Sequence, residues 1–89
     1  MSKPELFYRI SDPDGATARK AIMARGLLER VQFRNLHYEE VARDLAAHHA
    51  VTGRAGEATL PALWDGAVLH EGLAAVLAAL DGLAASRTA

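Results

Sequence analysis

The stretch RISDPDGATARK (residues 9–20) decides what kind of fold the chain can adopt. It continues ELFYRI (residues 5–10), whose aromatic and β-branched residues are typical of a strand. SDPDG is turn chemistry in which Ser11 or Asp12 can cap a following helix, and Pro13 suits the first helical position. The residues after the turn are good helix formers. The stretch therefore predicts a strand, a loop and a helix in close succession.

The rest of the chain alternates between strand and helix signals. Apolar periodicity predicts strands over residues 30–35, 59–64 and 67–70, and helices over residues 16–25, 37–49 and 71–85. The helix over residues 37–49 is expected to bury Tyr38, Val41, Leu45 and one of His48 and His49. Asp65-Gly66 is a hairpin signal between the last two strands. The order is β-α-β-α-β-β-α, which predicts a parallel first unit, an antiparallel hairpin and a four-stranded mixed sheet with helices on both faces.

Length and composition exclude several classes of protein. The 89 residues are expected to form one domain over 1–89, with a frayed tail at 86–89. Because 51% of the residues are hydrophobic, the chain is globular and not disordered. The net charge of −1, with both signs interspersed, argues against binding to nucleic acid or to an anionic membrane surface.

The absence of cysteine excludes disulfides, thiolate-ligated zinc and cysteine chemistry within the chain. No metal site is expected, because His48 and His49 diverge by about 100° on a helix and the other histidines lie on separate elements. The N-terminal segment lacks an apolar signal core, and GLAAVLAALDGLAA (residues 72–85) is too short to span a bilayer. A cytoplasmic protein is expected, and the richness in Ala, Gly and Arg points to a bacterial genome.

The opening stretch resembles a segment of the glutaredoxins, proteins of the thioredoxin fold. YRISDPDGATARKAI (residues 8–22) aligns with the segment that carries Cys-Pro-x-Cys after the first strand. In this alignment Asp12 takes the first cysteine position, Pro13 keeps the proline and Gly15 takes the second cysteine position. Arg9 matches a basic residue that is common there. Without a thiolate the chain cannot carry out thiol–disulfide exchange.

Two later segments extend the resemblance over most of the chain. ATLPALWDG (residues 58–66) resembles the segment that holds the cis-proline of the superfamily, with Pro61 at the proline position. DGAVLHEGLAAVL (residues 65–77) resembles the end of the glutathione transferase N-terminal domain. There Glu71 fits an acidic position and Gly72 replaces a serine.

The resemblance implies a thioredoxin-like, glutaredoxin-type fold with a binding groove beside Pro61. Leu60, expected to be joined to Pro61 by a cis bond, would present its backbone to an extended peptide or to glutathione. Arg9 could pair with the glycyl carboxylate of glutathione. Glu71 and Gly72, at the start of the last helix, could hold its γ-glutamyl end. No resident cofactor is implied; the expected ligand is glutathione or a peptide segment of a protein partner.

Several assignments have alternatives at this point. Asp12 can be a helix cap or a ligand contact, and Glu71 can favour the start of the last helix without touching a ligand. An enzymatic alternative is a minimal glutathione transferase that activates a bound thiol with Ser11 or Tyr8, although the helical domain of those enzymes is missing here. A further alternative is a dimerising module that uses the Ala-rich last helix. The chain is expected to be a monomer or a weak homodimer.

Overall fold

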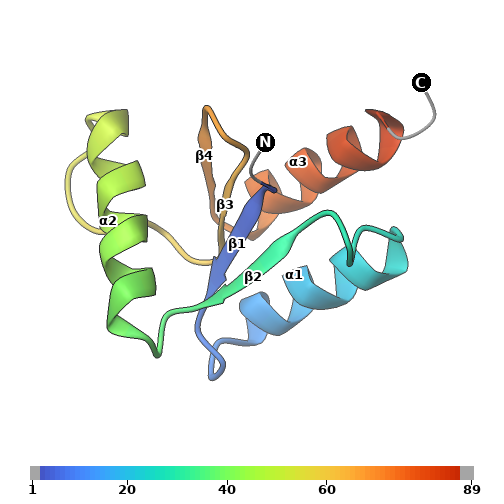
Figure 1. The fold of residues 1–89 in the computed structure, drawn as a ribbon, viewed down its shortest axis with the longest axis horizontal. Coiled ribbons are helices and arrows are strands. Elements are labelled where there is room, and N and C mark those ends of the chain that lie inside the picture. Colours follow the sequence, from blue (N-terminus) through green and yellow to red (C-terminus); the bar gives the residue numbers. More distant parts are fainter. Residues whose placement is uncertain (1–2, 87–89) are drawn as a thin grey trace.

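A central strand, β1 (Glu5–Tyr8), organises the sheet in the computed structural model, which describes residues 3–86. The other elements are α1 (Pro13–Ala24), β2 (Gln32–Asn35), α2 (Glu39–Thr52), β3 (Ala62–Trp64), β4 (Leu69–Glu71) and α3 (Leu73–Ser86). The four strands lie in the order β2-β1-β3-β4, with β1 parallel to β2 and the other neighbouring pairs antiparallel (Figure 1). The predicted element order and mixed sheet are confirmed.

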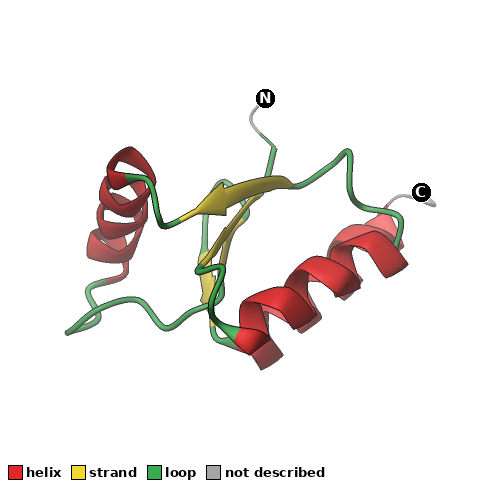
Figure 2. Cartoon of the chain, turned by 90° about the horizontal axis from the view of Figure 1, so that it is seen from below, coloured by secondary structure: helices red, strands yellow, loops and turns green. Residues whose placement is uncertain are grey.

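The helices cover both faces of the sheet, as predicted. Figure 2 shows α2 on one side of the strands and the other two helices together on the opposite side. Each face has its own core because successive side chains of β1 point to opposite sides. Leu6 and Tyr8 pack on the side of α1 and α3, and Phe7 packs on the side of α2. The first core includes Leu6, Tyr8, Ile22, Leu63, Val76 and Leu80, and the second Phe7, Leu36, Val41, Leu45, Ala62 and Leu69.

Local chemistry explains where α1 begins. Asp12 is its N-cap, and the Asp12 Oδ1 atom accepts a hydrogen bond from the Asp14 N–H at 3.1 Å. Pro13, which has no N–H to satisfy, is the first helical residue. The helix therefore starts three residues before the predicted range, directly at its capping signal. The capping role proposed for Asp12 is present in the structure.

The second helix differs from its prediction at both ends. It begins two residues later than expected and continues to Thr52, where Gly53 ends it in a left-handed conformation with φ +74°. Tyr38 was expected on the buried face, but it is the N-cap residue and its side chain is 57% exposed. Because Tyr38 precedes the helix and has an extended backbone, its side chain does not follow the helical spacing that places Val41 on the face toward the sheet. Of the two histidines, His49 is the buried one.

The chain between α2 and β4 contains the predicted proline and hairpin signals. The Leu60–Pro61 peptide bond is cis, and β3 begins only after it. None of the helices within residues 3–86 has both the length and the apolar character needed to cross a bilayer. Of the tail expected to fray, Ser86 is the last residue of α3, and residues 87–89 lie outside the described part of the chain.

Asp65 holds the hairpin turn between β3 and β4. Its Oδ1 accepts hydrogen bonds from the N–H groups of Ala67 and Val68, at 2.9 and 2.8 Å, and its Oδ2 lies 2.8 Å from His70 Nε2. Partial burial raises the pKa of the Asp65 carboxyl. The hydrogen bonds with His70, Val68 and Ala67 lower that pKa by more, so it falls below its ordinary value of 3.8.

We expect Asp65→Asn to lower the free energy of unfolding at pH 7 by about 0.5–1 kcal/mol. Because the carboxyl pKa is lower in the folded chain than in the unfolded chain, the charge stabilises the fold above pH ~4 and this effect disappears as the pH falls through the folded pKa. Urea unfolding at pH 7 and near pH 2.5 measures it. Glu57→Gln, at an exposed position, serves as the control. An equal penalty for Asp65→Asn at both pH values would contradict the assignment.

Candidate functional site

A groove opens where β1 ends and β3 begins. Because Phe7 pairs with Ala62 in antiparallel register, the residues that follow β1 and those that precede β3 leave the sheet at the same end of the strands. The groove has a volume of about 400 Å³ and lies between α2, the loop that precedes β3 and the start of the β1–α1 loop. Most of its lining is apolar; polar groups come from Arg9, His49 and Glu57. We call it the Leu60 groove, and its defining residues are Arg9, Leu45, His49, Glu57 and Leu60.

Leu60 lines the groove and has unpaired backbone groups within the described residues. Its side chain is half-buried and packs against the core that contains Phe7. Within residues 3–86, neither the N–H nor the C=O of Leu60 has a hydrogen-bond partner. The neighbouring Pro61 carbonyl, by contrast, accepts from the Gly72 N–H at 2.9 Å. Leu60 thus offers one free donor and one free acceptor beside the groove.

Arg9 reaches the groove, whereas Asp12 serves the helix. The Arg9 side chain is exposed, lines the groove and forms no ion pair with the described residues. The Arg9 carbonyl accepts a hydrogen bond from the Asp12 N–H at 3.0 Å, which fixes the loop after β1. The Asp12 carboxylate, half-buried, is turned to the first amides of α1. Of these two predicted site residues, the structure brings only Arg9 to the groove lining.

Glu71 lies in the interior, because it shares the α2 side of edge strand β4 with Leu69. Its side chain is only 8% exposed. Oε1 accepts a hydrogen bond from the Thr59 N–H at 2.9 Å and lies 3.7 Å from His49 Nε2. Oε2 forms an ion pair with the Arg54 guanidinium and makes no hydrogen bond of regular geometry with residues 3–86. The carboxylate is therefore enclosed by groups of the protein.

The N–H of Gly72 is also used inside the fold. It donates to the Pro61 carbonyl, and the Gly72 carbonyl accepts from the Val76 N–H at 3.0 Å, which begins α3. Gly72 has φ +88°, a left-handed conformation that glycine adopts without strain. A backbone requirement thus accounts for glycine at this position.

The two hydroxyls considered for thiol activation lie outside the groove lining. Tyr8 is only 8% exposed and belongs to the core under α1 and α3. Its ring packs edge-on against Phe33, with centroids 6.0 Å apart, and the Arg19 guanidinium lies 4.7 Å from its centroid. Ser11 is exposed on the loop before α1. The groove therefore gains no hydroxyl from either residue.

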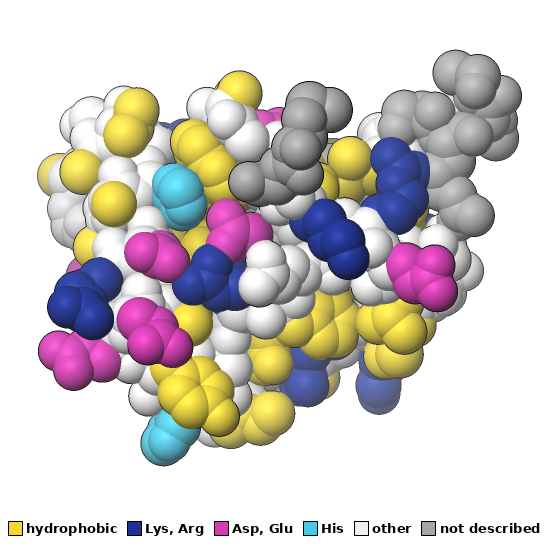
Figure 3. Space-filling model, viewed as in Figure 1, with side chains coloured by type: hydrophobic (Ala, Val, Ile, Leu, Met, Phe, Trp, Pro, Cys, Tyr) yellow, Lys and Arg dark blue, Asp and Glu magenta, His cyan; other side chains and the backbone are white. Residues whose placement is uncertain are grey.

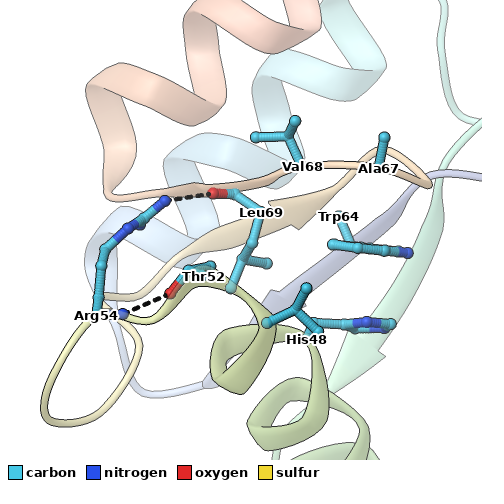
Figure 4. Close-up of a pocket in the computed structure, with 8 residues that line it drawn as sticks. His48, Thr52, Arg54, Trp64, Ala67, Val68 and Leu69 are labelled. Atoms are coloured by element: carbon cyan, nitrogen blue, oxygen red, sulfur yellow. Dashed lines mark hydrogen bonds between the residues drawn. The ribbon is translucent and has the colours of Figure 1, made fainter.

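A second hollow, of about 210 Å³, lies on the other side of α2 (Figure 4). His48 stacks on Trp64 there, with ring centroids 4.0 Å apart and an interplanar angle of 11°. Arg54 also lines this hollow, while its guanidinium reaches Glu71. The adjacent histidines thus point to different hollows, His48 to this one and His49 to the Leu60 groove. Their divergence is as predicted from helical geometry.

Charged side chains gather over α2 and the β2 edge in Figure 3. Arg34 lies between two carboxylates, forming ion pairs with Glu5 and, at 2.6 Å, with Asp44. The hydrogen bond to Asp44 raises the pKa of Arg34, and the interaction with Glu5 raises it further. Partial burial lowers this pKa by less, so the pKa of Arg34 lies above its ordinary value. His48 Nε2 lies 3.8 Å from Glu5 Oε2. The charges of Arg34, Glu5 and Asp44 therefore largely offset one another.

Comparison with known proteins identifies no relative: no protein-family model, curated protein or solved structure matches the chain. The Leu60 groove and the enclosed Glu71 carboxylate are therefore interpreted from their own geometry. Sequence reasoning missed His49, Arg54 and Glu57 as residues of this region. A signal for the enclosed carboxylate did exist, because Glu71 lies two residues after Leu69 on a strand and so shares its face.

Proposed function

We propose that this chain is a thioredoxin-like, glutaredoxin-type binding domain that holds an extended peptide chain in the Leu60 groove and performs no thiol–disulfide exchange. The element order and the mixed sheet are compatible with that fold. The ligand is a glutathione-like thiol peptide or an extended segment of a protein partner. The absence of cysteine removes the redox step but leaves backbone recognition intact. We place the domain in the cytoplasm.

The open backbone of Leu60 is the observation that carries the proposal. Backbone N–H and C=O groups strongly favour a hydrogen-bond partner. An extended peptide that lies along Leu60 supplies one acceptor and one donor, as in strand addition to a sheet edge. Such pairing requires no particular side chain at position 60. The adjacent apolar lining can then accept a side chain of the peptide.

The surroundings of the groove favour a peptide segment over glutathione bound by its γ-glutamyl end. That end would need the Glu71 carboxylate, which is enclosed, and the Gly72 N–H, which is already bonded. Two exposed apolar side chains, Ile10 and Tyr38, follow closely after groove residues on either side, with exposed fractions of 64% and 57%. We infer that a longer peptide chain would contact these side chains beyond the groove.

The other candidate functions have less support from the geometry. A transferase would need Tyr8 or Ser11 beside the bound thiol, and neither lines the groove. A dimer formed through α3 would need exposed apolar surface on that helix. Among the described residues, the large exposed hydrophobic side chains lie on other parts of the chain, whereas Val76 and Leu80 of α3 are fully buried.

We expect the capped tripeptide Ac-Ala-Gln-Ala-NH2 to shift the amide resonances of Leu60 and Arg9 in an NMR titration. A dissociation constant of order 1 mM is expected, equivalent to about 4 kcal/mol, because two backbone hydrogen bonds and one small side chain make the contact. Reduced glutathione, titrated in parallel, tests the smaller thiol peptide.

The control is the same tripeptide with its backbone amides N-methylated, which cannot donate to Leu60 C=O. Its affinity should fall by about tenfold, the effect of losing one hydrogen bond of about 1.4 kcal/mol. Equal affinity of the two peptides would contradict backbone pairing. If neither peptide nor glutathione shifts a groove amide, the proposed function is wrong.

A further inference from the structure

His49 stands between a fixed carboxylate and the Leu60 groove. Its ring lines the groove, and its Nε2 lies 3.7 Å from Glu71 Oε1. The His49 side chain is only 10% exposed and belongs to the buried face of α2, so packing limits its position. In the part of the chain that the structure describes, His49 takes part in side-chain hydrogen bonding only through its carbonyl, which accepts from Thr52 Oγ1, so neither ring nitrogen has a hydrogen-bond partner. When the imidazole is protonated, both nitrogens are donors.

The charges around His49 leave its proton uncompensated on the groove side. Glu71, on β4, faces the His49 ring, but its carboxylate is already paired with Arg54, which lies in the loop that follows α2. The remaining charged groups of the groove are Arg9, from the loop after β1, and Glu57, from the loop before β3, and they offset each other. Protonation of His49 therefore changes the groove from formally neutral to one net positive charge.

We propose that the Leu60 groove selects a peptide segment that carries a carboxylate, and that His49, which lies beside Glu71, is the residue that recognises it in the protonated state. This inference rests on the proposed function and names the ligand class of the same groove. A ligand carboxylate replaces water at the protonated ring and accepts a charge-assisted hydrogen bond. Arg9 supplies a second cation to the same ligand.

Binding must then be linked to a proton. An acidic side chain of the ligand is ionised throughout pH 6–8, because its ordinary pKa is about 4.3. Histidine is the side chain whose charge ordinarily changes near neutral pH, so a histidine that contacts the ligand couples binding to a proton. Since the ligand binds better to the protonated form of His49, its affinity rises as the pH falls from 8 to 6. A neutral ligand of the same shape lacks this linkage.

The test compares Ac-Ala-Glu-Ala-NH2 with Ac-Ala-Gln-Ala-NH2 by amide-shift titration at pH 6 and pH 8. The Glu peptide should bind about three- to tenfold more tightly at pH 6, and the Gln peptide equally at both pH values. His49→Gln should abolish the pH dependence of the Glu peptide. His37→Gln, which removes an exposed histidine of the same chain, should preserve it.

Failure of the acidic selectivity and failure of the proposed function give different results. If both peptides shift Leu60 but the Glu peptide shows no pH dependence, the groove binds peptides and the acidic selectivity is wrong. If the dependence survives His49→Gln, recognition by His49 is wrong. If His49→Gln does not fold, the pH titration of the His49 ring resonances replaces it, because the Glu peptide must raise the midpoint of that titration. If neither peptide shifts a groove amide, the proposed function and this inference fail together.

Discussion

Truncating Phe7 to alanine is expected to lower the free energy of unfolding by about 3–5 kcal/mol. Phe7 has no exposed surface and occupies the central strand of the sheet. Its ring packs edge-on against His48, with centroids 5.8 Å apart, and the Arg34 guanidinium lies 5.5 Å from its centroid. Alanine would leave a cavity between β1 and α2 that neighbouring side chains cannot fill without moving the helix. For a domain whose total stability is about 5–15 kcal/mol, this is a large fraction.

Urea unfolding followed by circular dichroism measures the effect. Phe7→Leu, which retains most of the apolar volume, should cost less than about 1.5 kcal/mol and provides a folded variant if alanine does not fold. Tyr38→Ala removes an aromatic ring that is 57% exposed and should change stability by about 0.5 kcal/mol or less. Equal losses for the alanine variants at positions 7 and 38 would contradict the burial of β1.

Replacing Arg54 with glutamine is expected to cost about 2–3 kcal/mol. Glu71, which is 8% exposed in the native chain, loses its cationic partner in this variant. Removing one partner of a fully buried ion pair costs about 3–5 kcal/mol, and the value is smaller here because Arg54 is 52% exposed and Glu71 keeps its hydrogen bond from the Thr59 N–H. The loop between α2 and β3 should also loosen, since the Glu71 carboxylate joins both of its ends.

The reverse substitution, Glu71→Gln, should cost less, about 1 kcal/mol, because the half-exposed Arg54 can then be hydrated. Combining both substitutions tests the pair directly. Once Glu71 is neutral, Arg54→Gln should add less than about 0.5 kcal/mol, which makes the two effects strongly non-additive. Urea unfolding of the four proteins measures this cycle, and hydrogen exchange of the Thr59 amide reports on the loop. Additive losses, or a larger cost for Glu71→Gln, would contradict the enclosed carboxylate.

Much of the fold was predictable because its signals are local. Asp12 caps α1 through an amide two residues away, and Asp65 binds amides two and three residues away. Gly53 ends α2 through its own backbone conformation, which is also a local signal, although the predicted helix ended four residues before Gly53, at residue 49. The candidate site was predictable only in part. The resemblance pointed to Arg9 and Leu60, which do line the groove, while the binding of a ligand there stays a prediction.

The sequence by itself determined the strand and helix order, the main caps and the hairpin, because each of these depends on hydrogen bonds and side-chain alternation within a few residues. Only the tertiary structure decided that the Glu71 carboxylate is enclosed with Arg54 and His49. The physical reason is desolvation: whether a charged group stays in water or requires an internal partner depends on which elements pack over it. Those elements come from distant parts of the chain, and their packing on the sheet also shapes the groove beside Leu60.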